Sequence, residues 1–303
     1  MVCAVAGSGL TFCPEEPWMP KLLSPEQVAA YERDGFVFPV DVLHPDEVRA
    51  LREELESWEQ ERGAAIDFPE KSKSYLLFDW ADQLAHHPKI LDAVEDLIGP
   101  DILVYHSTLF LKEAHTPAFV RWHQDSTYFY LEPHLHVTAW VALSDATVQA
   151  GCMQMLPGSH RWGAFEHDDQ PGPHNMIRRG QGISRRFDDT QGVFTPVMAG
   201  QMSLHHTDVV HASGANDSDD RRIALAISYI PAHLRPVGAV RPSALCVRGR
   251  DHGHFLPEQR LTQALSPHAF EAHREALARF RALQDAGFQP GPAAAADGPV
   301  SPA

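Results

Sequence analysis

The chain has few cysteines and no long apolar run. Its four cysteines, Cys3, Cys13, Cys152 and Cys246, include no C-x-x-C pair, so the sequence predicts neither a disulfide framework nor a cysteine-based zinc site. No apolar run reaches the roughly 18 residues that a membrane-spanning helix needs, and the apolar segment 1–13 lacks the positive charges that begin an export signal. We therefore expect a cytoplasmic protein.

Positive charge is also in deficit. The 25 Lys and Arg residues face 40 Asp and Glu residues, which gives a formal net charge of −15. This balance repels phosphate backbones and anionic lipids, so nucleic acids and membrane surfaces are excluded as expected partners. A hydrophobic content of 44% and a charged content of 21% are typical of a globular protein. The expected partner is a small-molecule substrate, and both a monomer and a homodimer remain possible.

Helical patterns come first along the chain and strand patterns follow. The patterns predict helices over residues 24–34, about 45–62, within 80–98 and over 268–286. Helices before strands indicate a β core with a helical layer packed against it. A short strand is predicted at 75–78, and period-two patterns predict further strands at 102–112, 119–123, 136–143, 152–156, 193–198, 201–205 and 222–230.

These patterns indicate one domain with terminal extensions. We expect an N-terminal extension over 1–23, a single domain over 24–287 and a flexible tail, rich in Pro, Ala and Gly, over 288–303. Within the domain we expect the helical layer at about 24–99, the β core at about 101–235 and a C-terminal helical segment at about 256–287.

The pattern His-x-Asp, which can supply two metal ligands, occurs four times. His44–Asp46 opens a predicted helix, where Pro and an acidic residue are ordinary start signals. His167–Asp169 lies in a stretch rich in Pro and Gly, which favours a solvated loop. Both of these triplets are therefore interpreted as structural.

The other two triplets are candidates for a metal site. His206–Asp208 competes because it lies close to His211, but apolar and aromatic residues surround His123–Asp125 and predict a strand that enters a buried cavity. Residues i and i+2 of a strand face the same way, so His123 and Asp125 can reach one metal. The residues that surround this pair are Phe119, Val120, Trp122, Tyr128, Phe129 and Tyr130.

A histidine and a carboxylate, joined by the distant His211, form a two-histidine, one-carboxylate set. This set leaves adjacent coordination positions open and suits non-haem Fe(II) oxygenases. A zinc hydrolase could use the same ligands with a metal-bound water, and a cupin-like sensor could keep them without turnover. These alternatives stay open at this point.

Arg222 begins a predicted strand with two different faces. Alternation places Arg222 with Ala224 and Ala226 on one face, and large aliphatic residues on the other. An arginine with open space beside it can hold a dicarboxylate through a bidentate ion pair. The alternative is a surface arginine on an edge strand.

Together these segments resemble the phytanoyl-CoA dioxygenase (PhyH) family of Fe(II)/2-oxoglutarate-dependent oxygenases. The resemblance spans about 24–235 and rests on the motifs at 122–129, 137–143, 151–160 and 200–216, together with Arg222. It implies a mainly β fold with flanking helices, a double-stranded β-helix or jelly roll of cupin type.

The resemblance also implies site residues and a reaction. His123, Asp125 and His211 match the Fe(II) ligands, and Arg222 matches the 2-oxoglutarate anchor. The reaction is hydroxylation of a C–H bond by molecular oxygen, with release of succinate and carbon dioxide; desaturation, cyclisation and epoxidation use the same ligands, whereas halogenation is disfavoured because Asp125 is present. Gln124, Ser213, Trp140 and Thr108 match positions that touch the cosubstrate, although Trp140 could instead lie in the core and Ser213 in a turn.

The substrate is less well defined. Residues 161–193 form a long segment without periodicity, interpreted as a lid, with disorder as the alternative. Arg178 or Arg179 could bind a carboxylate or phosphate there, and Tyr128 and Phe129 could line the substrate cavity or pack in the core. The loop at 174–181 resembles bacterial members that tailor natural products or modify amino acids, which suggests a role in secondary metabolism; the phytanoyl-CoA substrate is not carried over.

Overall fold

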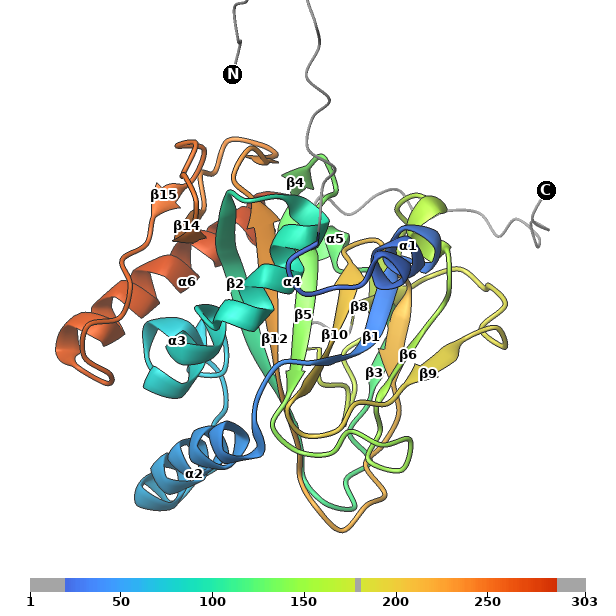
Figure 1. Ribbon diagram of the computed structural model, residues 1–303, viewed down its shortest axis with the longest axis horizontal. Helices are drawn as coiled ribbons and strands as arrows, with labels where there is room; N and C mark the ends of the chain where they lie inside the picture. Colours follow the sequence, from blue (N-terminus) through green and yellow to red (C-terminus); the bar gives the residue numbers. More distant parts are fainter. Residues whose placement is uncertain (1–19, 178–180, 288–303) are drawn as a thin grey trace, which may run out of the picture.

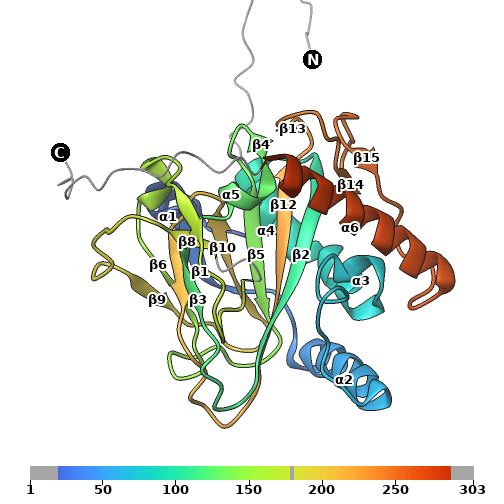
Figure 2. The same cartoon turned by 180° about the vertical axis from the view of Figure 1, so that it is seen from behind.

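Two β-sheets stand opposite each other in the computed structural model, which describes residues 20–177 and 181–287 (Figures 1 and 2). The larger sheet has the order β1 (Phe36–Asp41), β10 (Gln201–His206), β5 (Val137–Ala142), β12 (Arg222–Pro231), β2 (Ile102–Lys112), β14 (Ser243–Arg248) and β15 (Leu256–Pro257). The smaller sheet has the order β3 (Val120–His123), β11 (His211–Ser213), β6 (Met153–Met155) and β9 (Val193–Thr195).

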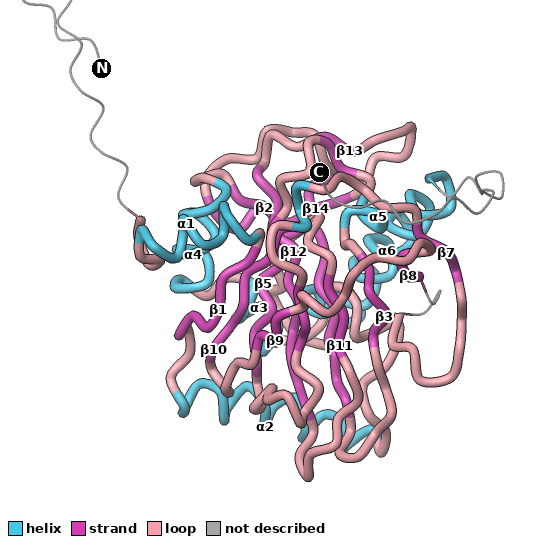
Figure 3. The backbone as a smooth tube through the Cα atoms, turned by 90° about the vertical axis from the view of Figure 1, so that its right-hand side faces the viewer, coloured by secondary structure: helices cyan, strands magenta, loops and turns pink. Residues whose placement is uncertain are grey.

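Neighbouring strands of both sheets are antiparallel, except that β14 and β15 are parallel. Figure 3 turns the molecule so that β3, β11 and β9 lie toward the viewer. Two short pairs complete the β structure: β4 (Leu131–Glu132) with β13 (Arg235–Pro236), and β7 (His167–Asp169) with β8 (Gln181–Ile183). The facing sheets agree with the jelly roll that the family resemblance implies.

Apart from the short α5, the helices lie close to the ranges that the sequence signals predict. Helix α1 starts after Ser24, whose side chain forms a capping box with Gln27, and it ends at Gly35 with a φ of 85°. The following helices are α2 (Pro45–Arg62), α3 (Asp79–Ala85), α4 (Pro88–Ile98), the short α5 (Ser126–Phe129) and α6 (Pro267–Gly287), while α1 spans Pro25–Asp34. Helices α1 to α4 lie between residues 25 and 98, the region in which the sequence patterns predict helices.

Strand β12 shows how the two faces of the larger sheet differ. Ile223 and Leu225 pack in the main core with apolar residues from α2, α3 and α4. Ala224 and Ala226 face the other way and pack with Trp140. Large side chains therefore fill the core between the larger sheet and the helices, and small side chains leave space between the two sheets.

Two local predictions are wrong. Residues 75–78 do not form a strand; the 3-10 turn Ser74–Leu76 lies there, and Tyr75 is fully buried. When every residue of a short apolar run is buried, its hydrophobic pattern shows no periodicity, so the sequence cannot distinguish a strand from a compact turn. Residues 167–169 are not a loop, because β7 pairs with β8 there.

The terminal predictions fall largely outside the described residues, as do Arg178 and Arg179. Of the N-terminal extension, the backbone amides of Leu22 and Leu23 donate to the Asp96 carboxylate. Within residues 20–177 and 181–287, no helix combines the length and hydrophobicity needed to cross a membrane.

Candidate metal centre

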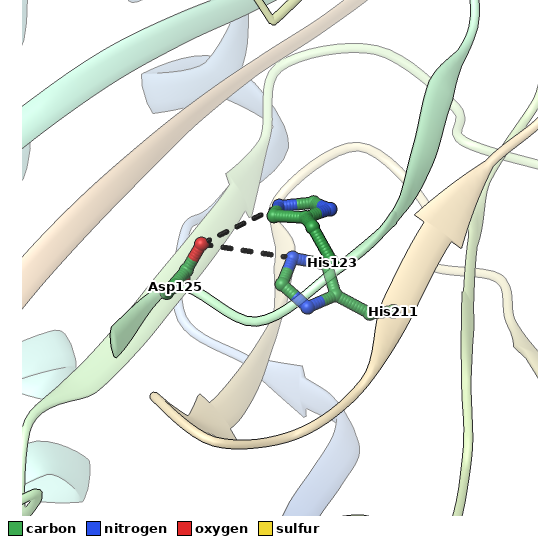
Figure 4. A group of neighbouring side chains, drawn as sticks. All are labelled: His123, Asp125 and His211. Carbon is green, nitrogen blue, oxygen red and sulfur yellow. Dashed lines mark ion pairs between the residues drawn. The ribbon is translucent and has the colours of Figure 1, made fainter. Parts of the chain in front are cut away.

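Three side chains predicted as metal ligands come together between the sheets. His123 ends β3 and His211 begins β11, and these two residues are direct partners in the antiparallel register. Oδ1 of Asp125 lies 3.5 Å from Nε2 of His123 and 3.9 Å from Nε2 of His211 (Figure 4). Ligand atoms of the three residues lie within 4.8 Å of one another, so the three side chains converge on a space that one metal ion could occupy.

Backbone carbonyls orient both imidazoles. Nδ1 of His123 lies 2.8 Å from the carbonyl oxygen of Arg121, and Nδ1 of His211 lies 3.0 Å from that of Val209. A hydrogen on each Nδ1, shared with these carbonyls, would leave each Nε2 with a lone pair for a metal ion. Burial lowers the pKa of His211 well below its ordinary value, which keeps the ring neutral as a metal ligand requires.

Asp125 reaches the site in a way that strand alternation does not describe. The strand ends at His123, and Asp125 has a helical backbone conformation at the start of α5, with φ −66° and ψ −32°. The expectation that His123 and Asp125 lie on one face of a strand is therefore wrong, although the two side chains do converge. The chain turns into α5 after Gln124, and this turn carries the carboxylate back toward the imidazoles.

Two residues that the sequence patterns did not assign to the site hold the other oxygen of Asp125. Thr138 Oγ1 donates to Oδ2 at 3.0 Å, and Nε2 of His205 lies 3.3 Å from the same oxygen. Burial opposes ionisation of Asp125, but hydrogen bonds from His123 and His205 outweigh it and hold the carboxyl pKa well below its usual range. Asp125 is therefore an anion with one oxygen anchored and the other directed at the histidines.

A cavity next to the three side chains extends to Arg222. It contains about 400 Å³ of space not filled by protein, including solvent at its mouth, and both sheets line it. Arg222 is 1% exposed, and its Nη1 donates to the carbonyl of Gly151 at 3.0 Å. Nε and Nη2 have no partner within the described residues, and the guanidinium lies 5.1 Å from the centre of the Trp140 ring. A buried guanidinium with unused donors beside a cavity suits a carboxylate ligand.

The four predicted cosubstrate residues lie in different places. Trp140 and Ser213 line the cavity with Arg222, whereas Thr108 is paired with Ala226 across β2 and β12 and is not a lining residue. Gln124 is also absent from the lining.

Gln124 instead holds the start of the predicted lid. The side chain is fully buried; Nε2 donates to the carbonyls of Gly163 and Asp208, and Oε1 accepts from the amide of Phe165. The backbone amide of Gln124 donates to Nε2 of His167 at 3.0 Å. One residue next to the metal ligands thereby fixes the segment that begins at 161.

Of the predicted substrate residues, Tyr128 lies near the candidate metal ligands and Phe129 lies in the core. The Tyr128 ring lies 5.8 Å from the His123 ring, which places it beside the candidate metal ligands. Phe129 is 8% exposed and packs in an aromatic cluster that includes Tyr105 and Phe280, so core packing describes it.

The competing triplet at 206–208 does not join the metal set. The Asp208 carboxylate lies 3.0 Å from Nδ1 of His134, and the backbone amide of Asp208 donates to Nδ1 of His206. In the described part of the chain, the group with metal-ligand geometry is His123, Asp125 and His211.

The chain matches known proteins over most of its length. A family model described as Phytanoyl-CoA dioxygenase (PhyH) matches residues 31–224. L-proline trans-4-hydroxylase of Streptomyces griseoviridis is 26% identical over 242 residues, which are 72% of this chain and 90% of that protein. A probable alpha-ketoglutarate-dependent hypophosphite dioxygenase of Stutzerimonas stutzeri is 30% identical over 54% of this chain and 57% of its own length, so the chain spans little more than half of that relative.

A solved structure covers more of the fold. The non-heme monooxygenase ThoJ, in its apo form, is 35% identical and has a TM-score of 0.77 over 86% of this chain and 98% of its own. The match therefore covers most of the chain and nearly all of that structure.

Proposed function

The chain belongs to the phytanoyl-CoA dioxygenase family, and from that premise we propose that it is a non-haem Fe(II)/2-oxoglutarate-dependent oxygenase. The proposed reaction is hydroxylation of an unactivated C–H bond in a small molecule, with molecular oxygen as oxidant and succinate and carbon dioxide as coproducts. We assign it to one catalytic domain over residues 24–287. The free thiols of Cys152 and Cys246 fit a reducing cytoplasm, where we place the protein.

His123, Asp125 and His211 would hold the iron through Nε2, Oδ1 and Nε2. When bound, Fe(II) supplies the oxygen chemistry that no amino-acid side chain can perform. The protein positions the ligands: two backbone carbonyls fix the imidazoles, and Thr138 and His205 fix the carboxylate. A ligand set on one side of the metal leaves the opposite side for cosubstrate and oxygen.

The observation that carries the proposal is Arg222. A buried guanidinium with two donors unused within the described residues shares one cavity with the metal ligands. The distal carboxylate of 2-oxoglutarate would satisfy those donors while the other end of the molecule reaches the metal. A zinc hydrolase or a cupin-like sensor needs the three ligands but has no use for such an anchor.

We infer the substrate class from the relatives. L-proline trans-4-hydroxylase matches 72% of the chain, which supports an amino acid or a related natural product as substrate. Desaturation and cyclisation would use the same ligands and differ only in the fate of the substrate radical. In a halogenase, halide would need the metal position that the Asp125 carboxylate takes, so the presence of Asp125 disfavours halogenation.

The proposal is tested by cosubstrate turnover. The purified protein, supplied with Fe(II), is screened with amino acids and related small molecules for succinate that forms only when oxygen and 2-oxoglutarate are both present. Product that carries one added oxygen, formed in equal amount to succinate, supports hydroxylation. Product formation without oxygen or 2-oxoglutarate would contradict the proposal and favour a hydrolase, and Asp125→Ala serves as the inactive control.

A further inference from the structure

A second buried basic side chain lies directly opposite Arg222. Lys112, the last residue of β2, is the register partner of Arg222, the first residue of β12. Lys112 is fully buried, and Arg222 is 1% exposed. Directly opposite residues of an antiparallel pair place their side chains on the same face, and like charges there destabilise the pair.

Within the described residues no carboxylate pairs with either of these two basic groups. Nζ of Lys112 donates to Ser213 Oγ at 2.9 Å and to the carbonyl of Gly214, and Arg222 donates to the carbonyl of Gly151. None of these acceptors is charged. Because an unpaired buried charge strongly destabilises a fold, the arrangement points to an anionic ligand that completes it.

Ser213 connects Lys112 to the cavity. Ser213 lines the cavity together with Arg222, whereas Lys112 lies behind it. A hydroxyl that accepts a hydrogen bond from an ammonium group has its own hydrogen free to donate elsewhere.

This inference rests on the proposed function: we propose that Lys112 is a positioning residue for the distal carboxylate of 2-oxoglutarate and that it acts through Ser213. Lys112 holds Ser213 Oγ so that its hydrogen is directed into the cavity, and its positive charge adds to that of Arg222. The carboxylate then meets a donor from Ser213 and the unused donors of Arg222.

The electrostatic surroundings of Lys112 agree with this role. Burial and the nearby Arg222 lower the pKa of Lys112 to about 6, and Cys152 is the other titratable group that faces it. Glu113, the next residue of the chain, is exposed and pairs with Arg221 instead. Binding of an anion would stabilise the protonated form of Lys112, so cosubstrate binding should be accompanied by proton uptake above pH 6.

The test measures binding and not turnover. The Ni(II)-loaded protein is titrated calorimetrically with 2-oxoglutarate and, separately, with 2-oxobutyrate, which chelates metal but lacks the distal carboxylate. Lys112→Met keeps an unbranched side chain, one atom shorter, and removes charge and donor. Ser213→Ala removes the hydroxyl, and Lys71→Met is the control because Lys71 pairs with Asp67 at the surface.

We expect Lys112→Met and Ser213→Ala each to weaken 2-oxoglutarate binding about tenfold, the double variant to be little weaker than either, and 2-oxobutyrate binding to stay unchanged. The wild type should also take up protons on binding 2-oxoglutarate, seen as a dependence of the heat on buffer, and Lys112→Met should not. Neither change is expected from a residue that only supports the fold.

Unchanged 2-oxoglutarate affinity in Lys112→Met, or equal loss for both keto acids, would overturn the inference. If Lys112→Met does not fold, Ser213→Ala decides, since unchanged 2-oxoglutarate affinity there would also overturn it. A wild type that binds Ni(II) but does not bind 2-oxoglutarate would instead overturn the proposed function.

Discussion

The hydroxyl of Thr138 donates a hydrogen bond of 3.0 Å to Oδ2 of Asp125. This contact occupies one oxygen of the carboxylate and leaves Oδ1 directed at the two histidines. A carboxylate held in this way binds a metal through one oxygen, which keeps coordination positions free for other ligands.

Replacing Thr138 with valine should weaken metal binding. The change keeps the shape of the side chain and removes the donor, so Asp125 is no longer fixed; loss of such a partner lowers metal affinity about 10- to 100-fold. Anaerobic competition with a chromophoric chelator measures the Fe(II) affinity. Thr190→Val, at an exposed position, is the control, and equal Fe(II) affinity in Thr138→Val and the wild type would contradict the role given to Thr138.

Asp125→Ala and Arg222→Ala should fail in different ways. Asp125→Ala removes a metal ligand and should abolish hydroxylation at any 2-oxoglutarate concentration. Arg222→Ala removes charged hydrogen bonds and should raise the KM for 2-oxoglutarate about 10- to 100-fold, with a smaller effect on kcat. Steady-state kinetics separate the two, and normal turnover in both variants would contradict the site assignment.

Gln124→Ala should release the start of the segment at 161–193. The variant loses the side-chain hydrogen bonds to Gly163, Phe165 and Asp208, which leaves buried backbone groups unpaired and should lower the free energy of unfolding by about 1–3 kcal/mol. Hydrogen–deuterium exchange should accelerate at 163–169. Gln170→Ala, at an exposed position, is the matched control, and unchanged exchange in Gln124→Ala would show that the segment is held by other contacts.

The ligand-free protein should become more stable as pH rises above 6, in part because of Lys112. Its folded pKa is about 6 against an ordinary value of 10.5, so between these pH values the unfolded chain binds a proton that the folded chain does not. The free energy of unfolding therefore gains up to about 1.4 kcal/mol per pH unit from this group within that window.

Urea denaturation of the wild type and Lys112→Met at pH 6.5, 7.5 and 8.5, without ligand, checks this prediction. Lys112→Met should exceed the wild type in unfolding free energy by the largest amount at pH 6.5, and this difference should shrink as pH rises. Parallel profiles would mean that Lys112 keeps its proton in the folded state.

Much of the fold could be predicted because its signals are local. The alternation of Arg222, Ala224 and Ala226 with large aliphatic residues is enough to identify β12 and the face that it turns to the cavity. The capping residues of α1 and α2 are likewise local, since each lies within a few positions of the helix that it begins.

The rest depends on contacts between distant parts of the chain. His205 meets Asp125 across 80 positions, and Lys112 meets Ser213 across 101, so no spacing rule would have found either residue. The convergence of His123 and Asp125 was expected from a strand, but a turn into α5 produces it. Sequence patterns identified the residue types of the site, and only the packing of the two sheets shows how they are held.

The central claim is that one Fe(II) and 2-oxoglutarate bind together between the two sheets. The most direct measurement is an anaerobic optical titration of the purified protein with Fe(II) and then 2-oxoglutarate. We predict a weak visible charge-transfer band when 2-oxoglutarate is added, and its loss in His211→Ala. Binding of Fe(II) without any band on addition of 2-oxoglutarate would contradict the account, because the cosubstrate would then not reach the metal that His123, Asp125 and His211 hold.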